Sequence, residues 1–79
     1  MDPRRVMPGY HVALPPADRH RVEASEGEPL LWLALVRLDS DAALVNLRAP
    51  VVVNPRRMIG IQVIQTDSPY PVDHRLPLD

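Results

Sequence analysis

Two valine- and isoleucine-rich runs in the second half of the chain constrain its fold more than any other feature. They cover residues 43–53 and 58–65, and residues 54–57, Asn-Pro-Arg-Arg, lie between them. β-branched side chains favour strands, whereas Asn and Pro favour turns. The sequence therefore predicts an antiparallel hairpin that closes at residues 54–57.

The alternation of side chains along these runs predicts which face of each strand meets the core. Side chains at every second position of a strand share one face. In the first strand, the predicted core-facing residues are Ala43, Val45 and Leu47. In the second strand, one face carries Ile59, Ile61 and Val63, and the other carries Gly60 and Gln62. Pro50 has no N–H to donate to a ladder, so we expect it on an edge or at a bend.

Residues 30–38, LLWLALVRL, are compatible with a helix or with a strand. Leucine and alanine favour a helix, and a continuous apolar run has no diagnostic period. A Pro/Gly loop precedes the run, and Asp39-Ser40-Asp41 supplies turn residues before the next β-type segment. We therefore predict a strand buried on both faces, with Trp32 in the core.

The remaining segments predict little regular structure. Residues 1–9 are interrupted by Asp-Pro and Pro-Gly pairs, which predict turns around no more than one helical turn. Residues 10–14 alternate as a strand does, and residues 17–24 are charged and have room for one or two helical turns. From residue 66 onward, repeated prolines predict an extended tail.

Together these segments predict a single all-β domain over residues 1–79. Its expected form is a small antiparallel sheet of four or five strands, curled toward a barrel or sandwich, with at most one short helix. A chain of 79 residues has no room for a second core. The absence of cysteine excludes disulfides and favours a cytoplasmic location.

Composition and motifs argue against an enzyme, a cofactor site and a metal site. The chain has no cysteine, only three glycines, and serines that lie in turn-like sequence without a nucleophile motif. The histidines lie in separate segments without paired ligand spacing. The net charge of -1 provides no global field for nucleic acid. The longest apolar run is far shorter than the ~20 residues of a membrane helix. These features fit a binding module.

The motifs of the second half resemble those of the flagellar assembly factor FliW family. Residues 46–54, NLRAPVVVN, carry Asn, Ala-Pro and a second Asn at the family's spacing, and the Gly-Ile-Gln of residues 60–62 follows. Asp2-Pro3 ahead of Pro8-Gly9-Tyr10, and Tyr70 with His74, also look like family features. Members usually carry aromatic residues where Val6 and Met7 stand, and they have N-terminal strands with no counterpart before Met1. The chain thus resembles the C-terminal portion of the family.

This resemblance implies a non-enzymatic function in the cytoplasm. FliW proteins bind flagellin and also bind CsrA, an RNA-binding translational regulator, so that flagellin synthesis follows flagellin consumption. A FliW-like chain is therefore expected to bind a CsrA-type regulator, flagellin or both, and to contact neither nucleic acid nor membrane directly.

The sequence offers a small set of polar and turn residues as candidate partner contacts. They are Asn46, Arg48, Pro50, Asn54, Arg56, Arg57 and Gln62. Five of them have a structural alternative: the asparagines can stabilise turns beside proline, Gln62 beside Gly60 can mark a bulge, and the arginines of residues 56–57 can form a solvated hairpin tip. Arginine at these positions would pair with acidic groups of a partner.

Two other functions remain open. Without neighbouring strands, an open sheet edge exposes unpaired N–H and C=O groups, to which a partner strand or a second copy can add. The chain would then be a structural domain that self-associates without regulatory activity. A single-strand nucleic-acid binder would need aromatic platforms and a basic groove. Two tyrosines, one tryptophan and the near-neutral charge argue against it.

Overall fold

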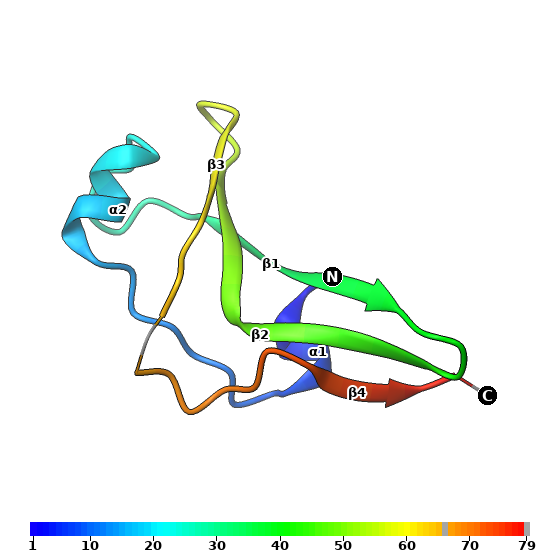
Figure 1. Ribbon diagram of the computed structural model, residues 1–79. Helices are drawn as coiled ribbons and strands as arrows, with labels where there is room; N and C mark the ends of the chain where they lie inside the picture. Colours follow the sequence, from blue (N-terminus) through cyan, green and yellow to red (C-terminus); the bar gives the residue numbers. More distant parts are fainter. Residues whose placement is uncertain (66, 79) are drawn as a thin grey trace.

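The computed structural model describes residues 1–65 and 67–78 and shows an antiparallel sheet of four strands with two short helices (Figure 1). In chain order the elements are α1 (Pro3–Val6), α2 (Pro16–Arg21), β1 (Leu31–Leu38), β2 (Ala42–Asn54), β3 (Ile59–Gln62) and β4 (His74–Pro77). β2 is the central strand, with β1 along one side, and β3 and β4 on the other side beside its two ends. The predicted all-β antiparallel sheet is confirmed.

β2 bends sharply in its middle, and Figure 1 shows its two halves running in different directions. The register with β1 jumps there, since Leu33 lies opposite Val51 whereas Leu35 lies opposite Asn46. Pro50 is fully buried at this bend, and its carbonyl accepts a hydrogen bond from the Val63 N–H at 2.8 Å. The predicted bend at Pro50 is confirmed. Within the described residues, the sheet bends but does not close into a barrel.

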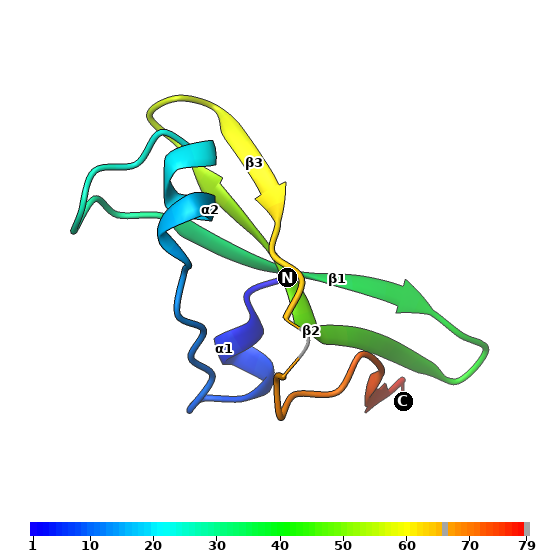
Figure 2. The ribbon, with the colours of Figure 1, turned by 60° about the vertical axis from the view of Figure 1, so that its left-hand side comes forward.

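The bend divides the core into two clusters on one face of the sheet. Near β4, the first cluster is built on Tyr10, Ala34, Val45 and Leu47. Near β3, the second is built on Val22, Val52 and Val63, with Ile59 and Ile61 packed against it. Figures 1 and 2 agree that β4 and the β1–β2 hairpin extend to one end of the molecule, whereas β3 and α2 lie at the other. The core face predicted for the first hairpin strand, with Ala43, Val45 and Leu47, is confirmed, and the face predicted to carry Ile59, Ile61 and Val63 proves to be the core side of the second strand.

Two helices form where at most one was predicted, and the segment predicted as the first strand is not in the sheet. The Asp2 side chain accepts a hydrogen bond from the Arg4 N–H at 2.9 Å and caps α1, and proline begins both helices. Residues 10–14 join α1 to α2 without pairing to any described strand. Their apolar alternation reflects contact with the core, because Tyr10, Val12 and Leu14 pack on the two clusters.

The prediction that β1 is buried on both faces is wrong. Leu31, Leu33 and Leu35 are 53%, 39% and 50% exposed, and Trp32 is only half-buried. β1 is the outer strand, and both core clusters lie on the opposite face, so no core cluster covers these leucines within the described residues. The strand prediction itself is confirmed for β1.

Strand lengths in the second half of the chain also differ from the sequence prediction. β3 is shorter than the predicted strand of residues 58–65, because only Ile59 to Gln62 have partners on β2. The tail contains β4, which was not predicted and which pairs with Ala42 to Val45 of β2. Thr66, where the predicted tail begins, lies outside the described residues. A four-residue strand that ends in proline has little local signal, so its pairing with β2 decides its conformation.

Tyr10 ties the segment before α2 to the core. Its hydroxyl donates a hydrogen bond to the buried Leu47 carbonyl at 2.7 Å, and its ring lies 4.5 Å from the ring of Tyr70, centroid to centroid. Desolvation by burial, with a further contribution from Tyr70, raises the pKa of Tyr10 from 10.0 to about 12.

This pKa predicts a loss of stability in alkali. Because Tyr10 of the unfolded chain ionises near pH 10 whereas the folded chain keeps the proton to about pH 12, its contribution is complete below pH 10 and falls as the pH rises through this window. We expect the free energy of unfolding, measured with urea, to fall less between pH 9 and pH 11.5 in Tyr10→Phe than in the wild type. An equal fall of the free energy of unfolding in both proteins would contradict the raised pKa of Tyr10.

Candidate functional site

The face of the sheet opposite the core carries a continuous apolar surface. Residues directly opposite each other on neighbouring strands point to the same face. Leu31 lies opposite Val53 and Val53 opposite Gly60, whereas Leu33 lies opposite Val51 and Val51 opposite Gln62. Beyond the bend, Leu35 lies opposite Asn46. We call this surface the leucine face; it comprises Leu31, Leu33, Leu35, Asn46, Val51, Val53, Gly60 and Gln62.

The leucine face leaves several large apolar side chains exposed to solvent. The leucines are about half exposed, and Val51 and Val53 are only partly buried. A contiguous exposed apolar patch rimmed by polar side chains marks an interaction surface in soluble proteins. The leucine face has this composition, because Asn46 and Gln62 lie among its apolar side chains.

At Gly60 the leucine face carries no side chain on β3. A Cβ atom at this position would lie 3.3 Å from the Val53 Cγ2 and 3.8 Å from the Val51 Cγ1. The 3.3 Å contact would be tight, so the absence of a side chain at Gly60 lets the two valines pack directly against the main chain of β3, which stays exposed at Gly60.

Asn46 and Gln62 meet at the bend of β2. The Asn46 Oδ1 accepts hydrogen bonds from the N–H groups of Arg48 and Ala49 at 3.1 and 3.0 Å. The Gln62 Nε2 donates to the Ala49 carbonyl at 3.1 Å. Both side chains therefore bond to Ala49 and hold the bend, while Gln62 remains exposed on the leucine face. A role as partner contacts stays a prediction for both.

Asn54 and Pro50 lie in the interior. Asn54 is buried, and its Nδ2 donates to the carbonyls of Val22 and Glu23 at 2.8 and 3.3 Å. Its Oδ1 accepts a hydrogen bond from the Arg56 N–H at 3.1 Å. These bonds join the end of β2 to the segment after α2, so Asn54 acts as the turn stabiliser that the sequence allowed.

The three candidate arginines are separated in space by their elements. The Arg48 Nε donates to the Tyr70 carbonyl at 2.9 Å and ties the C-terminal loop to β2. Arg56 and Arg57 are exposed in the turn between β2 and β3. Within the described residues, neither forms an ion pair. Partner contact remains a prediction for all three.

Sequence reasoning missed the leucines of this surface because it placed them in the core. Their continuous apolar run was a usable signal, since a strand that is apolar on both sides needs a layer on each face. Within the described residues, the two core clusters lie on the face opposite these leucines. The exposed leucines are the consequence.

The described part of the chain holds no group of three or more His, Asp or Glu side chains arranged to bind a metal ion. Within the same residues, no helix has the length and apolar character needed to cross a membrane. The leucine face, with its apolar side chains and hydrogen-bonding rim, is suited to bind another polypeptide.

Comparison with known proteins agrees with this architecture. A crystal structure of the flagellar assembly factor FliW superimposes with a TM-score of 0.86 at 25% identity, over 95% of this chain and 55% of that chain. Flagellar assembly factor FliW of Carboxydothermus hydrogenoformans is 38% identical over 99% of this chain and 51% of the relative. Its counterpart in Thermotoga maritima is 32% identical over 96% of this chain and 53% of the relative.

The chain therefore spans about half the length of these relatives. The family model described as FliW protein matches residues 1–76, which is nearly the whole chain. On this match, and on the relatives and the shared fold, the chain belongs to the FliW family.

Proposed function

We propose that this chain is a non-enzymatic flagellar assembly factor that acts as a single domain in the cytoplasm. It binds a CsrA-type translational regulator, flagellin or both, and so couples flagellin translation to flagellum assembly. The observation that carries this proposal is the exposed leucine face in a member of a family whose relatives are named flagellar assembly factors.

The physical basis for partner binding is the burial of exposed leucine surface. Covering apolar surface contributes roughly 25 cal/mol per Å² removed from water. Polar side chains at the rim, such as Gln62, add orientation because their hydrogen bonds are directional. Protein interfaces combine these two elements, and neither requires a catalytic group.

The decisive test is calorimetric titration of the folded chain with the CsrA-type regulator and with flagellin from the same source. We expect one or both to bind, and we expect Leu33→Glu to weaken binding at least tenfold, since it places a charge in the middle of the leucine face. Leu38→Glu is the matched control, because Leu38 lies on the same strand, is exposed and points to the opposite face. If the folded wild type binds neither protein, or if both variants lose binding equally, the proposal fails.

Self-association is the second candidate function, and the outer side of β1 favours it. On this side the main-chain hydrogen bonds within the described residues are those of Met1. Its carbonyl accepts a hydrogen bond from the Ala34 N–H at 2.6 Å, and its amino group donates one to the Ala34 carbonyl at 3.2 Å. The rest of the edge is open to another strand. Sedimentation velocity over a range of concentrations separates the two functions: a dimer that binds neither regulator nor flagellin would select self-association.

A further inference from the structure

The start of the chain lies against the outer edge of β1 as one rung of an antiparallel ladder. Figures 1 and 2 both show the N-terminus beside the middle of β1. Met1 and Ala34 exchange two main-chain hydrogen bonds, since the Met1 carbonyl accepts from the Ala34 N–H and the Met1 amino group donates to the Ala34 carbonyl. Two residues that exchange both bonds form a hydrogen-bonded pair of antiparallel strands. This pairing sets the direction in which a further strand would run along β1.

Beyond this rung, the outer side of β1 has unpaired main-chain groups at Val36 and Leu38. The Asp39 N–H donates to the Ala42 carbonyl at 2.8 Å, so the main-chain groups of Asp39 face β2. Main-chain groups of successive residues point to opposite sides of an antiparallel strand. Those of Val36 and Leu38 therefore face outward, as those of Ala34 do. Within residues 1–65 and 67–78, no main-chain hydrogen bond is found on the outer side at these two positions.

The side chains along this edge are apolar and poorly covered. Val36 and Leu38 lie opposite buried residues of β2 and so belong to the core face of the sheet. They are nevertheless 41% and 74% exposed. Natural edge strands usually carry charges or proline that prevent pairing with another strand. From residue 35 to residue 38, the only charged side chain is Arg37, and there is no proline. The edge is therefore suited to receive a strand.

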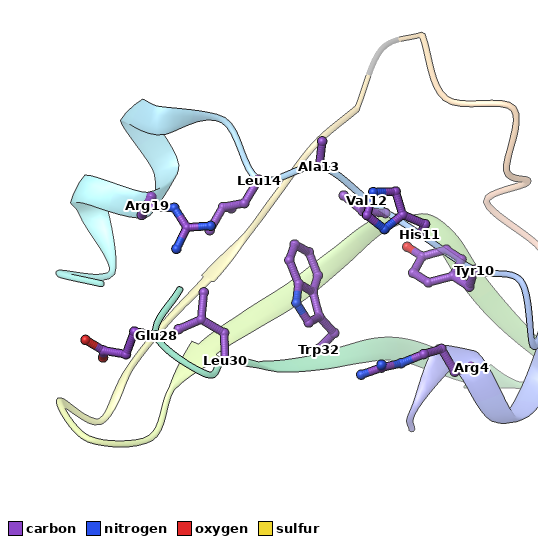
Figure 3. Close-up of a pocket in the computed structure, with 10 residues that line it drawn as sticks. All are labelled: Arg4, Tyr10, His11, Val12, Ala13, Leu14, Arg19, Glu28, Leu30 and Trp32. Atoms are coloured by element: carbon purple, nitrogen blue, oxygen red, sulfur yellow. The ribbon is translucent and has the colours of Figure 1, made fainter. Parts of the chain in front are cut away.

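The core beside the other end of β1 is incompletely filled. Figure 3 shows Trp32 standing between β1 and the segment that joins the two helices. A cavity of about 580 Å³ lies here, and its apolar lining residues Val12, Leu14, Leu30 and Trp32 are only half-buried. Because protein interiors are close-packed, a cavity of this size next to the core leaves room for further side chains beside β1.

FliW relatives contain enough further chain to supply a strand at this edge. The chain spans about half the length of the relatives that it matches, so each of them has a second half with no counterpart in residues 1–79. A sheet extends by pairing at an edge. β1 is the longest of the three edge strands, with eight residues against four in β3 and four in β4.

We propose that the outer edge of β1 binds a β-strand from this second half of a FliW-type polypeptide. The strand pairs antiparallel with β1, continues the rung that Met1 begins, and covers Val36 and Leu38. This inference rests on the edge geometry and on membership of the family. It does not require binding of a regulator or of flagellin, so the two proposals fail separately.

The test measures amide hydrogen exchange at Val36 and Leu38. The whole chain is compared alone and mixed with a polypeptide comprising the part of Carboxydothermus hydrogenoformans FliW that it does not match. We expect exchange at both amides to slow about tenfold or more in the mixture, because carbonyl groups of the added strand accept hydrogen bonds from them. A fusion of the same polypeptide ahead of Met1 repeats the measurement at high effective concentration. The fusion keeps the test decisive if the separate polypeptide does not stay in solution.

Val36→Pro is the variant that removes the outward N–H, and proline is tolerated on an edge strand whose N–H faces solvent. In the fusion, it should make exchange at Leu38 about tenfold faster, because one rung of the added ladder is lost. Val36→Thr is the matched control, because it keeps the N–H and a β-branched side chain; exchange at Leu38 should stay slow. Leu38→Pro, read at the Val36 amide, replaces Val36→Pro if the latter loses the dispersed amide spectrum of the folded chain.

The proposal is overturned if both amides exchange as fast in the fusion as in the chain alone, or if Val36→Pro and Val36→Thr behave alike. Slow exchange at these amides in the chain alone that is lost on dilution would also overturn it, by assigning the edge to a second copy of this chain.

Discussion

Leu47→Ala is expected to lower the free energy of unfolding by about 3 to 5 kcal/mol. Leu47 is fully buried in the cluster that also holds Tyr10, Ala34 and Val45. Removing its side chain leaves a cavity between the sheet and the segment that Tyr10 anchors. Such a loss is a large fraction of the stability of a small domain. Urea unfolding followed by far-ultraviolet circular dichroism measures it.

Leu38→Ala is the matched control for this experiment. It removes the same atoms from a residue of β1 that is 74% exposed. We expect the free energy of unfolding to change by less than about 0.5 kcal/mol. Equal losses in the two variants would mean that Leu47 is not packed in the core as described.

Asn54→Leu is expected to cost about 2 to 4 kcal/mol, although leucine is the more apolar side chain. Asn54 bonds to the carbonyls of Val22 and Glu23 and to the Arg56 N–H. Leucine satisfies none of these groups, and a buried polar group left without a partner costs about 1 to 3 kcal/mol. The substitution should detach the segment after α2 from the end of β2. Amide hydrogen exchange at Val22 and Arg56 would report this detachment before global unfolding.

Asn46→Leu provides the comparison at a position of similar chemistry. Asn46 accepts two main-chain hydrogen bonds, but it is only partly buried, so water can replace the lost partner. We expect a cost of about 1 kcal/mol. If Asn46→Leu proves as costly as Asn54→Leu, the burial of Asn54 does not explain its effect.

The sequence predicted the hairpin of β2 and β3 because its signals are local. Alternating valine and isoleucine define the core-facing side of both strands, and proline at positions 50 and 55 marks the bend and the turn. The motif of residues 46–54 led to the FliW family, which the comparisons confirm. Local chemistry acts between residues a few positions apart, so it can be read without the fold.

The candidate contact residues could not be assigned from the sequence in the same way. Asparagine beside proline has the same appearance whether its amide faces a partner or the interior. Only the position of the segment after α2 shows that the Asn54 amide is used internally. By contrast, Gln62 stays exposed because the other face of β3 carries the core contacts.

By itself, then, the sequence determined the all-β class, the central hairpin with its two faces, and the family. The tertiary structure alone decided three other features. Leu31, Leu33 and Leu35 are exposed, residues 10–14 line a cavity rather than join the sheet, and β4 forms in the tail. The physical reason is that backbone preferences and turns are set by neighbours in the sequence, whereas burial is set by which segments cover each face. Here both core clusters form on one side of the sheet, and the three leucines of β1 on the other side stay about half exposed.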